Sequence, residues 1–202
     1  MLDRWAIRLL RPALDTGARG LQRAGVSADA VTLAGFALGL VAAAAIAWQR
    51  PGWGLVLLLA SRLCDGLDGA LARLGAPTDR GGFLDITLDF LFYAAIPLAF
   101  AFADPAANAL AAAALLAAFI GTGSTFLAFA AVAARRGITS PVYPRKGLYY
   151  LGGLTEATET LACFVAMCLW PGHFATFAWV FAALCVPTIA TRLVAGWRAF
   201  SP

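Results

Sequence analysis

Residues 31–48 read VTLAGFALGLVAAAAIAW and contain no charged side chain. A helix needs about 20 apolar residues to cross the hydrocarbon core of a bilayer, so this run predicts a membrane span. Five further predicted spans follow at residues 53–74, 83–102, 106–134, 148–170 and 174–197, of which the first is apolar only in its first half. We therefore predict an all-α integral membrane protein with six transmembrane helices. The chain of 202 residues is 61% hydrophobic and 13% charged, which excludes a soluble enzyme, a disulfide scaffold and a disordered chain.

The N-terminal residues 1–24 alternate apolar side chains with Arg4, Arg8 and Arg11. This pattern predicts an amphipathic helix that lies in the membrane interface, followed by a single six-span domain at residues 25–202. With the N-terminus inside, the cytoplasmic ends and loops hold twelve Lys and Arg side chains, and the outer turns hold only Arg50. This bias places both termini in the cytoplasm, and we expect a bacterial inner membrane as the location.

Histidine and cysteine give little sign of a metal or redox centre. The single histidine, His173, excludes a site built from several imidazoles. The four cysteines fall in apolar runs without a CxxC pair, so we interpret them as small core residues.

Four aspartates interrupt the second and third predicted spans: Asp65, Asp68, Asp85 and Asp89. An aspartate at the centre of a membrane helix costs about 2.5–3.5 kcal/mol, and acids in such positions usually serve function. Each pair shares one helix face, and the short loop between the spans predicts antiparallel neighbours, so the four carboxylates should converge near the cytoplasmic end. Oxygen ligands suit Mg²⁺, Mn²⁺ or Ca²⁺ rather than Zn²⁺. Two such ions would balance four carboxylates and favour in-line displacement at phosphorus.

Two glycines, Gly66 and Gly69, stand among these acids on the second span. Glycine destabilises a helix interior by about 1 kcal/mol, so their presence requires a reason. Tight helix packing is one explanation, and close approach of a ligand is the other. With the aspartates and Arg73 adjacent, we favour the ligand.

The stretch DGLDGALAR at residues 65–73, followed by Gly81, Asp85 and Asp89, resembles the signature of the CDP-alcohol phosphatidyltransferase family. The stretch SADAVT at residues 27–32 resembles, less closely, the Pro-Asn-x-x-Thr sequence with which that family enters its first span. The plan of six spans after an interfacial helix is also similar, so the resemblance covers most of the chain.

The resemblance implies transfer of a phosphatidyl group from CDP-diacylglycerol to an alcohol or phospho-alcohol, with release of CMP. It implies Mg²⁺ or Mn²⁺, two per site, and a homodimer in contact with membrane lipids but not with nucleic acid. By position, the metal ligands are Asp65, Asp68, Asp85 and Asp89, and Asp89 is also the general base. The implied CDP-binding residues are Asp29, Thr32, Gly69, Ala72, Arg73 and Gly81.

Basic side chains gather at the cytoplasmic end of the last three spans: Arg135, Arg136, Arg145, Lys146 and Arg192. Topology and anionic lipids explain the loop residues, but Arg192 lies within its span. Because family members that take phosphorylated alcohols use basic residues here, the resemblance slightly favours a phosphorylated acceptor. Glu156 and Glu159 open the fifth span. They either shape the acceptor pocket or cap the helix and pair with Arg62 or Arg192.

Two other functions fit an aspartate-rich membrane protein. Intramembrane prenyltransferases bind diphosphates through aspartates and Mg²⁺, but they typically carry two separated aspartate-rich motifs and more spans. A cation or proton-coupled transporter would line a pathway with carboxylates, but the outer halves of the second to fourth spans are almost entirely apolar. Small residues in the fourth span, including Gly121 and Gly123, indicate either helix packing or a dimer face.

Overall fold

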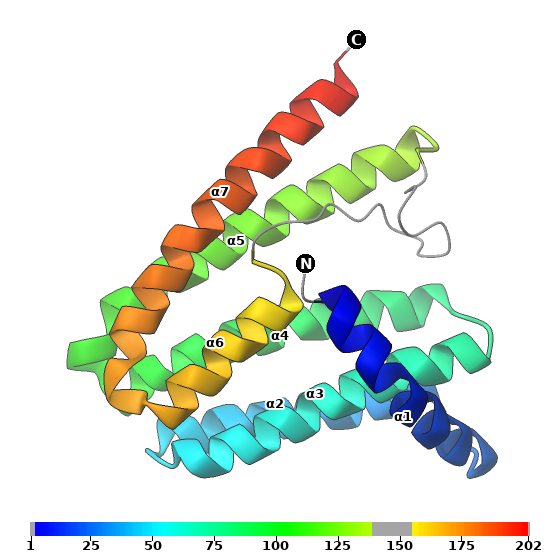
Figure 1. Cartoon of the computed structure of the whole chain (residues 1–202), viewed down its shortest axis with the longest axis horizontal. Helices are drawn as coiled ribbons and strands as arrows, with labels where there is room; N and C mark the ends of the chain where they lie inside the picture. Colours follow the sequence, from blue (N-terminus) through cyan, green and yellow to red (C-terminus); the bar gives the residue numbers. More distant parts are fainter. Residues whose placement is uncertain (1–2, 139–154, 202) are drawn as a thin grey trace.

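The computed structural model describes residues 3–138 and 155–201, whose regular elements are all helices (Figure 1). This confirms the all-α prediction. In chain order the helices are α1 Asp3–Arg23, α2 Ala28–Ala47, α3 Pro51–Leu74, α4 Asp79–Ala103, α5 Pro105–Arg135, α6 Ala157–Leu169 and α7 Phe174–Phe200, with a short 3₁₀ turn, η1, at Pro171–His173.

Within residues 3–138 and 155–201, four helices are long and apolar enough to cross a membrane: α2, α4, α5, and α7 together with η1. Helix α3 has 24 residues, about 36 Å at 1.5 Å per residue, but it carries Arg62, Asp65 and Asp68. Helix α6 has 13 residues, and the first part of the predicted fifth span lies outside the described residues. Six spans therefore remain a prediction, of which four are supported by length and composition.

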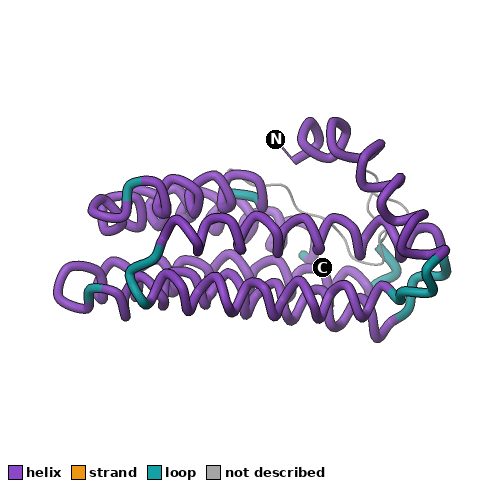
Figure 2. Tube along the Cα trace, turned by 90° about the horizontal axis from the view of Figure 1, so that it is seen from below, coloured by secondary structure: helices purple, strands orange, loops and turns teal. Residues whose placement is uncertain are grey.

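Helices α2 and α3 run side by side, and α5 and α7 diverge from them toward the C-terminal end of α7 (Figure 1). Helix α1 runs at an angle to the long helices (Figure 2). Helix α2 packs against both α3 and α4, and α5 packs against α4 and α7. Helices α3 and α4 follow each other across a short turn but make few direct contacts, so the expected packing of these two helices against each other is wrong. Leu14 and Ala18 of α1 pack against Leu67 and Leu71 of α3. Residues 3–23 are thus helical as predicted, and their interfacial position remains a prediction.

Small residues let α2 approach α3 closely. A Cβ atom at Gly35 would lie 2.8 Å from Cβ of Cys64, and one at Gly54 would lie 2.5 Å from Cγ1 of Ile46. Ser61 Oγ donates a hydrogen bond of 2.7 Å to the Gly35 carbonyl. In membranes, packing of this kind replaces the hydrophobic effect as the force between helices, and it fixes the face of α3 that carries the aspartates.

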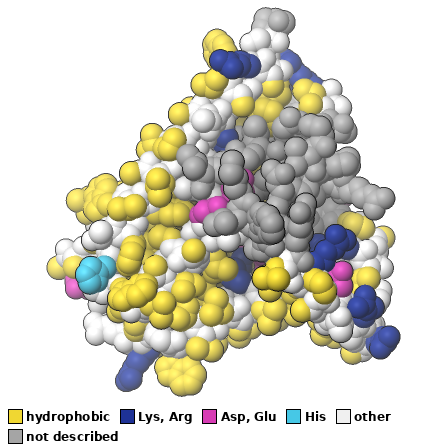
Figure 3. All heavy atoms as spheres, in the orientation of Figure 1, with side chains coloured by type: hydrophobic (Ala, Val, Ile, Leu, Met, Phe, Trp, Pro, Cys, Tyr) yellow, Lys and Arg dark blue, Asp and Glu magenta, His cyan; other side chains and the backbone are white. Residues whose placement is uncertain are grey.

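Aromatic side chains form the interior between α4, α6 and α7. Phe92, Phe164 and Phe174 are fully buried, and the rings of Phe100 and Phe174 stack with centroids 4.6 Å apart. On the outside, apolar side chains cover much of the face seen in Figure 3, with basic side chains mostly near its edges. An apolar exterior of this kind suits a lipid environment.

The glycines of α5 pack within the subunit. A Cβ at Gly121 would lie 2.5 Å from Cδ1 of Ile189 on α7, and one at Gly123 would overlap with Cε1 of Phe90 on α4. These contacts favour the packing interpretation over a dimer face for both residues. The homodimer remains a prediction.

Candidate active site

The four aspartates lie on facing stretches of α3 and α4. Asp65 and Asp68 occupy the C-terminal half of α3, and Asp85 and Asp89 the first half of α4. The Thr78 side chain caps α4 by accepting a hydrogen bond of 3.0 Å from the Gly81 backbone N–H. This cap starts α4 right after the short connection, and the two acidic stretches consequently meet.

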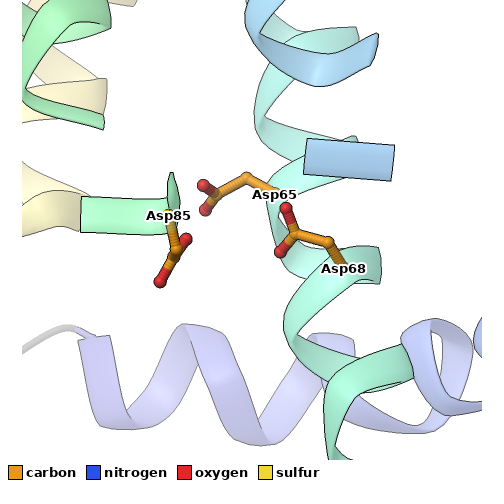
Figure 4. Close-up of side chains that lie close together, drawn as sticks. All are labelled: Asp65, Asp68 and Asp85. Atoms are coloured by element: carbon orange, nitrogen blue, oxygen red, sulfur yellow. The ribbon is translucent and has the colours of Figure 1, made fainter. Parts of the chain in front are cut away.

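Three of the carboxylates converge on one space between α3 and α4 (Figure 4). One oxygen from each of Asp65, Asp68 and Asp85 lies within 4.8 Å of the other two. Oxygen ligands on opposite sides of a divalent ion are separated by about 4–5 Å, so this spacing suits such an ion. Asp68 is only 3% exposed, and its Oδ2 atom has no hydrogen-bond partner. A buried carboxylate oxygen of this kind needs a cation or a donor, and the donor set therefore fits Mg²⁺ or Mn²⁺.

The fourth carboxylate, that of Asp89, has a different neighbour. Its Oδ1 atom lies 2.6 Å from Nη1 of Arg62, and the same nitrogen lies 3.4 Å from Oδ1 of Asp65. Arg62 was expected, in one interpretation, to pair with Glu156 or Glu159, and that pairing is wrong because its guanidinium is taken up by the aspartates. The structure thus adds a cation to the site that sequence reasoning did not place there.

These groups surround a small pocket that is partly open to the surface. All four aspartates line it, together with Thr32, Ser61 and Arg62. Thr32 is the predicted CDP-binding residue that the structure brings directly to the acidic group. The cavity therefore combines anionic metal ligands with a hydroxyl and a guanidinium.

Two further predicted CDP-binding residues lie together, where α2 and α4 begin. Asp29 accepts from Arg80 Nε at 2.8 Å and lies 2.6 Å from Arg80 Nη2. A Cβ at Gly81 would come within 3.2 Å of Asp29 Oδ1. Gly81 thus permits close approach of the two helix starts. The ion pair to Arg80 was missed because it joins residues 51 positions apart.

The two glycines of the acidic stretch have different surroundings. A Cβ at Gly66 would meet the side chain of Leu14 on α1 at 3.1 Å, so packing explains Gly66 and the ligand interpretation was wrong for it. At Gly69 a Cβ would meet only Nη1 of Arg73, at 3.4 Å. Gly69 borders open space, with half-buried Ala72 and exposed Arg73 following on the same helix. The role of these three residues in CDP binding stays a prediction.

The predicted acceptor residues lie apart from the four aspartates in sequence and belong to other helices. Arg192 is 9% exposed and donates from Nη1 to the Thr122 carbonyl at 3.0 Å. Arg135 and Arg136 are exposed at the end of α5, and Arg136 Nη2 donates to the Phe200 carbonyl at 3.1 Å. Arg145 and Lys146 lie outside the described residues.

Glu156 and Glu159 form a capping box at the start of α6. The Glu156 backbone N–H donates to Oε2 of Glu159 at 3.2 Å, and the Glu156 side chain accepts from the backbone of the third helical residue. The capping interpretation of these two residues is therefore confirmed. Their carboxylates serve the helix start.

Arg62 is the main functional residue that sequence reasoning missed as part of the site. The signal was present: Arg62 lies three residues before Asp65, which places the two side chains on neighbouring positions of one helix face. A cation inside a span is also expensive enough to indicate a partner. The spacing alone did not show that the partner is Asp89 of another helix.

Comparison with known proteins agrees with this geometry. Residues 26–190 match the sequence profile described as CDP-alcohol phosphatidyltransferase. The chain is 54% identical over 200 residues to the inner membrane protein YnjF of Escherichia coli strain K12, covering 98% of this chain and 96% of that protein. It is 32% identical over 191 residues to a phosphatidylinositol phosphate synthase of Mycobacteroides abscessus, covering 87% and 80%.

Solved structures show the same fold. The phosphatidylinositol phosphate synthase PgsA1 of Mycobacterium tuberculosis with CDP-DAG bound superposes with a TM-score of 0.73 at 24% identity, over 91% of this chain and 93% of that one. Its complex with manganese and citrate gives 0.71 at 25% identity, over 91% and 88%. With the profile covering most of the sequence and the aspartates in place, this membrane protein belongs to the CDP-alcohol phosphatidyltransferase family.

Proposed function

We propose that this protein transfers a phosphatidyl group from CDP-diacylglycerol to a phosphorylated alcohol and releases CMP. The observation that carries the reaction is the three-carboxylate group with the orphaned Asp68 oxygen, beside a fourth carboxylate at Asp89. Relatives named phosphatidylinositol phosphate synthase support the phosphorylated acceptor. Family membership and the single acidic group favour this reaction over prenyl transfer and over transport.

In this reaction Asp65, Asp68 and Asp85 hold a divalent cation, which neutralises charge on the diphosphate. Asp89 accepts the proton of the acceptor hydroxyl. The hydroxyl oxygen forms a bond to the phosphorus that carries the diacylglycerol, and the bond from that phosphorus to the bridging oxygen breaks. CMP leaves with the electron pair. Such transfers depend on positioning and charge neutralisation more than on covalent catalysis by the protein.

The cytidine side of the site is assigned to the residues around the starts of α2 and α4 and the end of α3. Thr32 lines the cavity directly, and Asp29, three residues before it on α2, lies next to Gly81. Gly69 leaves room for the nucleotide because only the flexible end of Arg73 lies near it. Arg73, with Ala72 one residue earlier, is placed to contact the diphosphate.

The acceptor phosphate is assigned to the basic residues near the ends of α5 and α7. Arg192 is buried within α7, a costly place for a cation unless it serves a purpose. The two glutamates of α6 would repel a phosphate if they were free, but both are engaged in the capping box. The capping box fixes these carboxylates at the start of α6 but does not remove their negative charge, so the acceptor phosphate must bind at the basic residues and away from that helix start. Arg135, Arg136 and Lys146 are further candidates for the same phosphate.

Three wider features belong to the proposal. The protein lies in a bacterial inner membrane with its active site facing the cytoplasm, because the charge bias of the sequence predicts that orientation. Two divalent ions act together, because the three converging carboxylates and the charged diphosphate of the substrate together carry enough negative charge for two. The enzyme works as a homodimer. Counting bound Mn²⁺ per chain and measuring the mass of the purified protein in nanodiscs test the last two.

CMP release identifies the acceptor. Purified protein with CDP-diacylglycerol and Mg²⁺ should release CMP with glycerol phosphate or inositol phosphate, and not with glycerol, inositol, serine or ethanolamine. Arg192→Ala should raise the KM for the phosphorylated acceptor at least about tenfold, the usual effect of removing one charged contact, with little change in the KM for CDP-diacylglycerol. Arg198→Ala, an exposed arginine of the same helix, is the matched control. Turnover only with unphosphorylated alcohols would refute the assignment.

A further inference from the structure

Arg62 is a buried cation in the polar centre of a membrane protein. Its side chain is 12% exposed, and Nη1 contacts Asp89 at 2.6 Å and Asp65 at 3.4 Å. A buried ion pair adds little stability compared with apolar residues of the same size. A guanidinium within a membrane helix is nevertheless expensive. Stability alone therefore does not explain why arginine stands at this position.

The guanidinium of Arg62 is fixed by groups other than the aspartates. Its central carbon lies 3.9 Å from the centroid of the Phe92 ring, and Nη2 donates to Ser61 Oγ at 3.3 Å. Both supports are fully buried, and Ser61 is itself tied to the Gly35 carbonyl. The position of the Arg62 guanidinium is therefore fixed by buried neighbours. A carboxylate that pairs with Arg62 is in turn held in a defined position.

Asp89 is the carboxylate that Arg62 holds in position. It follows Asp85 by four residues and shares its helix face, yet its oxygen lies on Arg62, while Asp85 joins the group of three. We propose that Arg62 is a positioning residue that divides the four carboxylates. It holds Asp89 toward the acceptor hydroxyl and leaves the other three for the metal ion. This inference rests on the proposed role of Asp89 as the general base.

The division has an electrostatic consequence for metal binding. A positive charge beside Asp65 opposes a divalent ion in the same group of carboxylates. Removing that charge should tighten metal binding. Neutralising Asp89 should instead release the guanidinium toward Asp65 and weaken metal binding, even though Asp89 does not contact the ion. That second effect requires Arg62, and a cycle of variants isolates the requirement.

The test measures Mn²⁺ binding without substrates, from the electron paramagnetic resonance signal of free Mn²⁺, with the full protein in nanodiscs. Arg62→Met should bind Mn²⁺ about tenfold more tightly than the native protein, and Asp89→Asn more weakly. In the double variant, the Asp89 substitution should have no further effect. Arg50→Met changes the same charge at an exposed turn and serves as the control. Equal weakening by Asp89→Asn in both backgrounds would make Asp89 a direct metal ligand and overturn the proposal.

Arg62→Lys separates position from charge, and it serves where the methionine variant does not fold. Lysine keeps the charge but lacks the planar fork that contacts Asp89 and covers Phe92. We expect Mn²⁺ binding within about twofold of native, kcat at least about tenfold lower, and the KM for CDP-diacylglycerol unchanged. Native kcat in a monodisperse Arg62→Lys protein would overturn the proposal. Absence of CMP release by the native enzyme would instead refute the proposed function and leave the Mn²⁺ results standing.

Discussion

Asp68→Asn is expected to raise the thermal stability of the metal-free protein while it abolishes activity. Asp68 is 3% exposed and its Oδ2 atom has no hydrogen-bond partner. Oxygens of Asp65 and Asp85 lie within 4.8 Å of an oxygen of Asp68. Without a cation, the three like charges repel one another, and asparagine of the same shape removes the most buried of them. Function and stability therefore oppose each other at this residue.

The size of the effect follows from the distances. Two unit charges 4.8 Å apart repel by about 3.5 kcal/mol at an effective dielectric constant of 20. Asp85 is exposed and the Asp65 side chain is 36% exposed, so solvent screens both pairs. We expect a net gain of about 1–3 kcal/mol in the free energy of unfolding. For a chain of this length that corresponds to about 2–10 °C in Tm.

Thermal unfolding of the purified protein in detergent measures this gain. In excess chelator, Asp68→Asn should unfold at a higher temperature than the native protein. Saturating Mn²⁺ should stabilise the native protein and leave the variant almost unchanged, because binding to the folded state alone raises Tm. Asp79→Asn, at an exposed position of α4, controls for loss of a charge. A lower Tm for Asp68→Asn in chelator, or a native response to Mn²⁺, would refute the reasoning.

Two further predictions follow from packing and from topology. Gly39→Ala should lower Tm and kcat, because its Cβ would lie 2.6 Å from Cδ2 of Phe92 and overpacking costs about 1–3 kcal/mol of stability. The control Gly52→Ala would meet nothing within 4 Å and should leave Tm and kcat unchanged. Equal Tm values for the two variants would contradict this prediction. Cysteines placed at Gln49 and His173 should react only with reagents added outside the cell. Labelling of either position from the cytoplasm would show that the predicted orientation is wrong.

Helix periodicity was sufficient to predict the group of three carboxylates. Spacings of three and four residues put each pair on one face, and a connection of a few residues keeps the two acidic stretches near each other. The two helices make few direct contacts, however, and what holds both in place is α2, which packs against each of them. The structure confirms that Asp65, Asp68 and Asp85 meet. The place of Asp89 could not be predicted in this way, because it depends on the side-chain direction of Arg62, which the interior around Phe92 decides.

Gly66 shows a second limit of reading a helix by its faces. Periodicity tells which residues share a face but not which element covers it. Here Leu14 of α1 packs against Gly66 of α3. The two residues are 52 positions apart, so no local pattern shows this contact. The capping box at Glu156 and Glu159 is the opposite case. Its spacing of three residues at a helix start is a local signal, and the structural interpretation of these glutamates was correct for that reason.

Helix α3 carries a charged active site in a lipid environment because it turns polar side chains toward the protein interior and several apolar side chains outward. Its Ser61 and Asp68 are buried, whereas Val56 and Leu63 are more than half exposed. Ser61 then finds a partner on α2 and Arg62 one on α4, and the exposed apolar side chains suit a lipid environment. Because α3 relies on its neighbours in this way, it would be a poor span by itself. The charges that weaken α3 as an isolated helix are the ones proposed to bind the metal and to position Asp89. The helix most important to the proposed chemistry is therefore also one that composition does not identify as a membrane span.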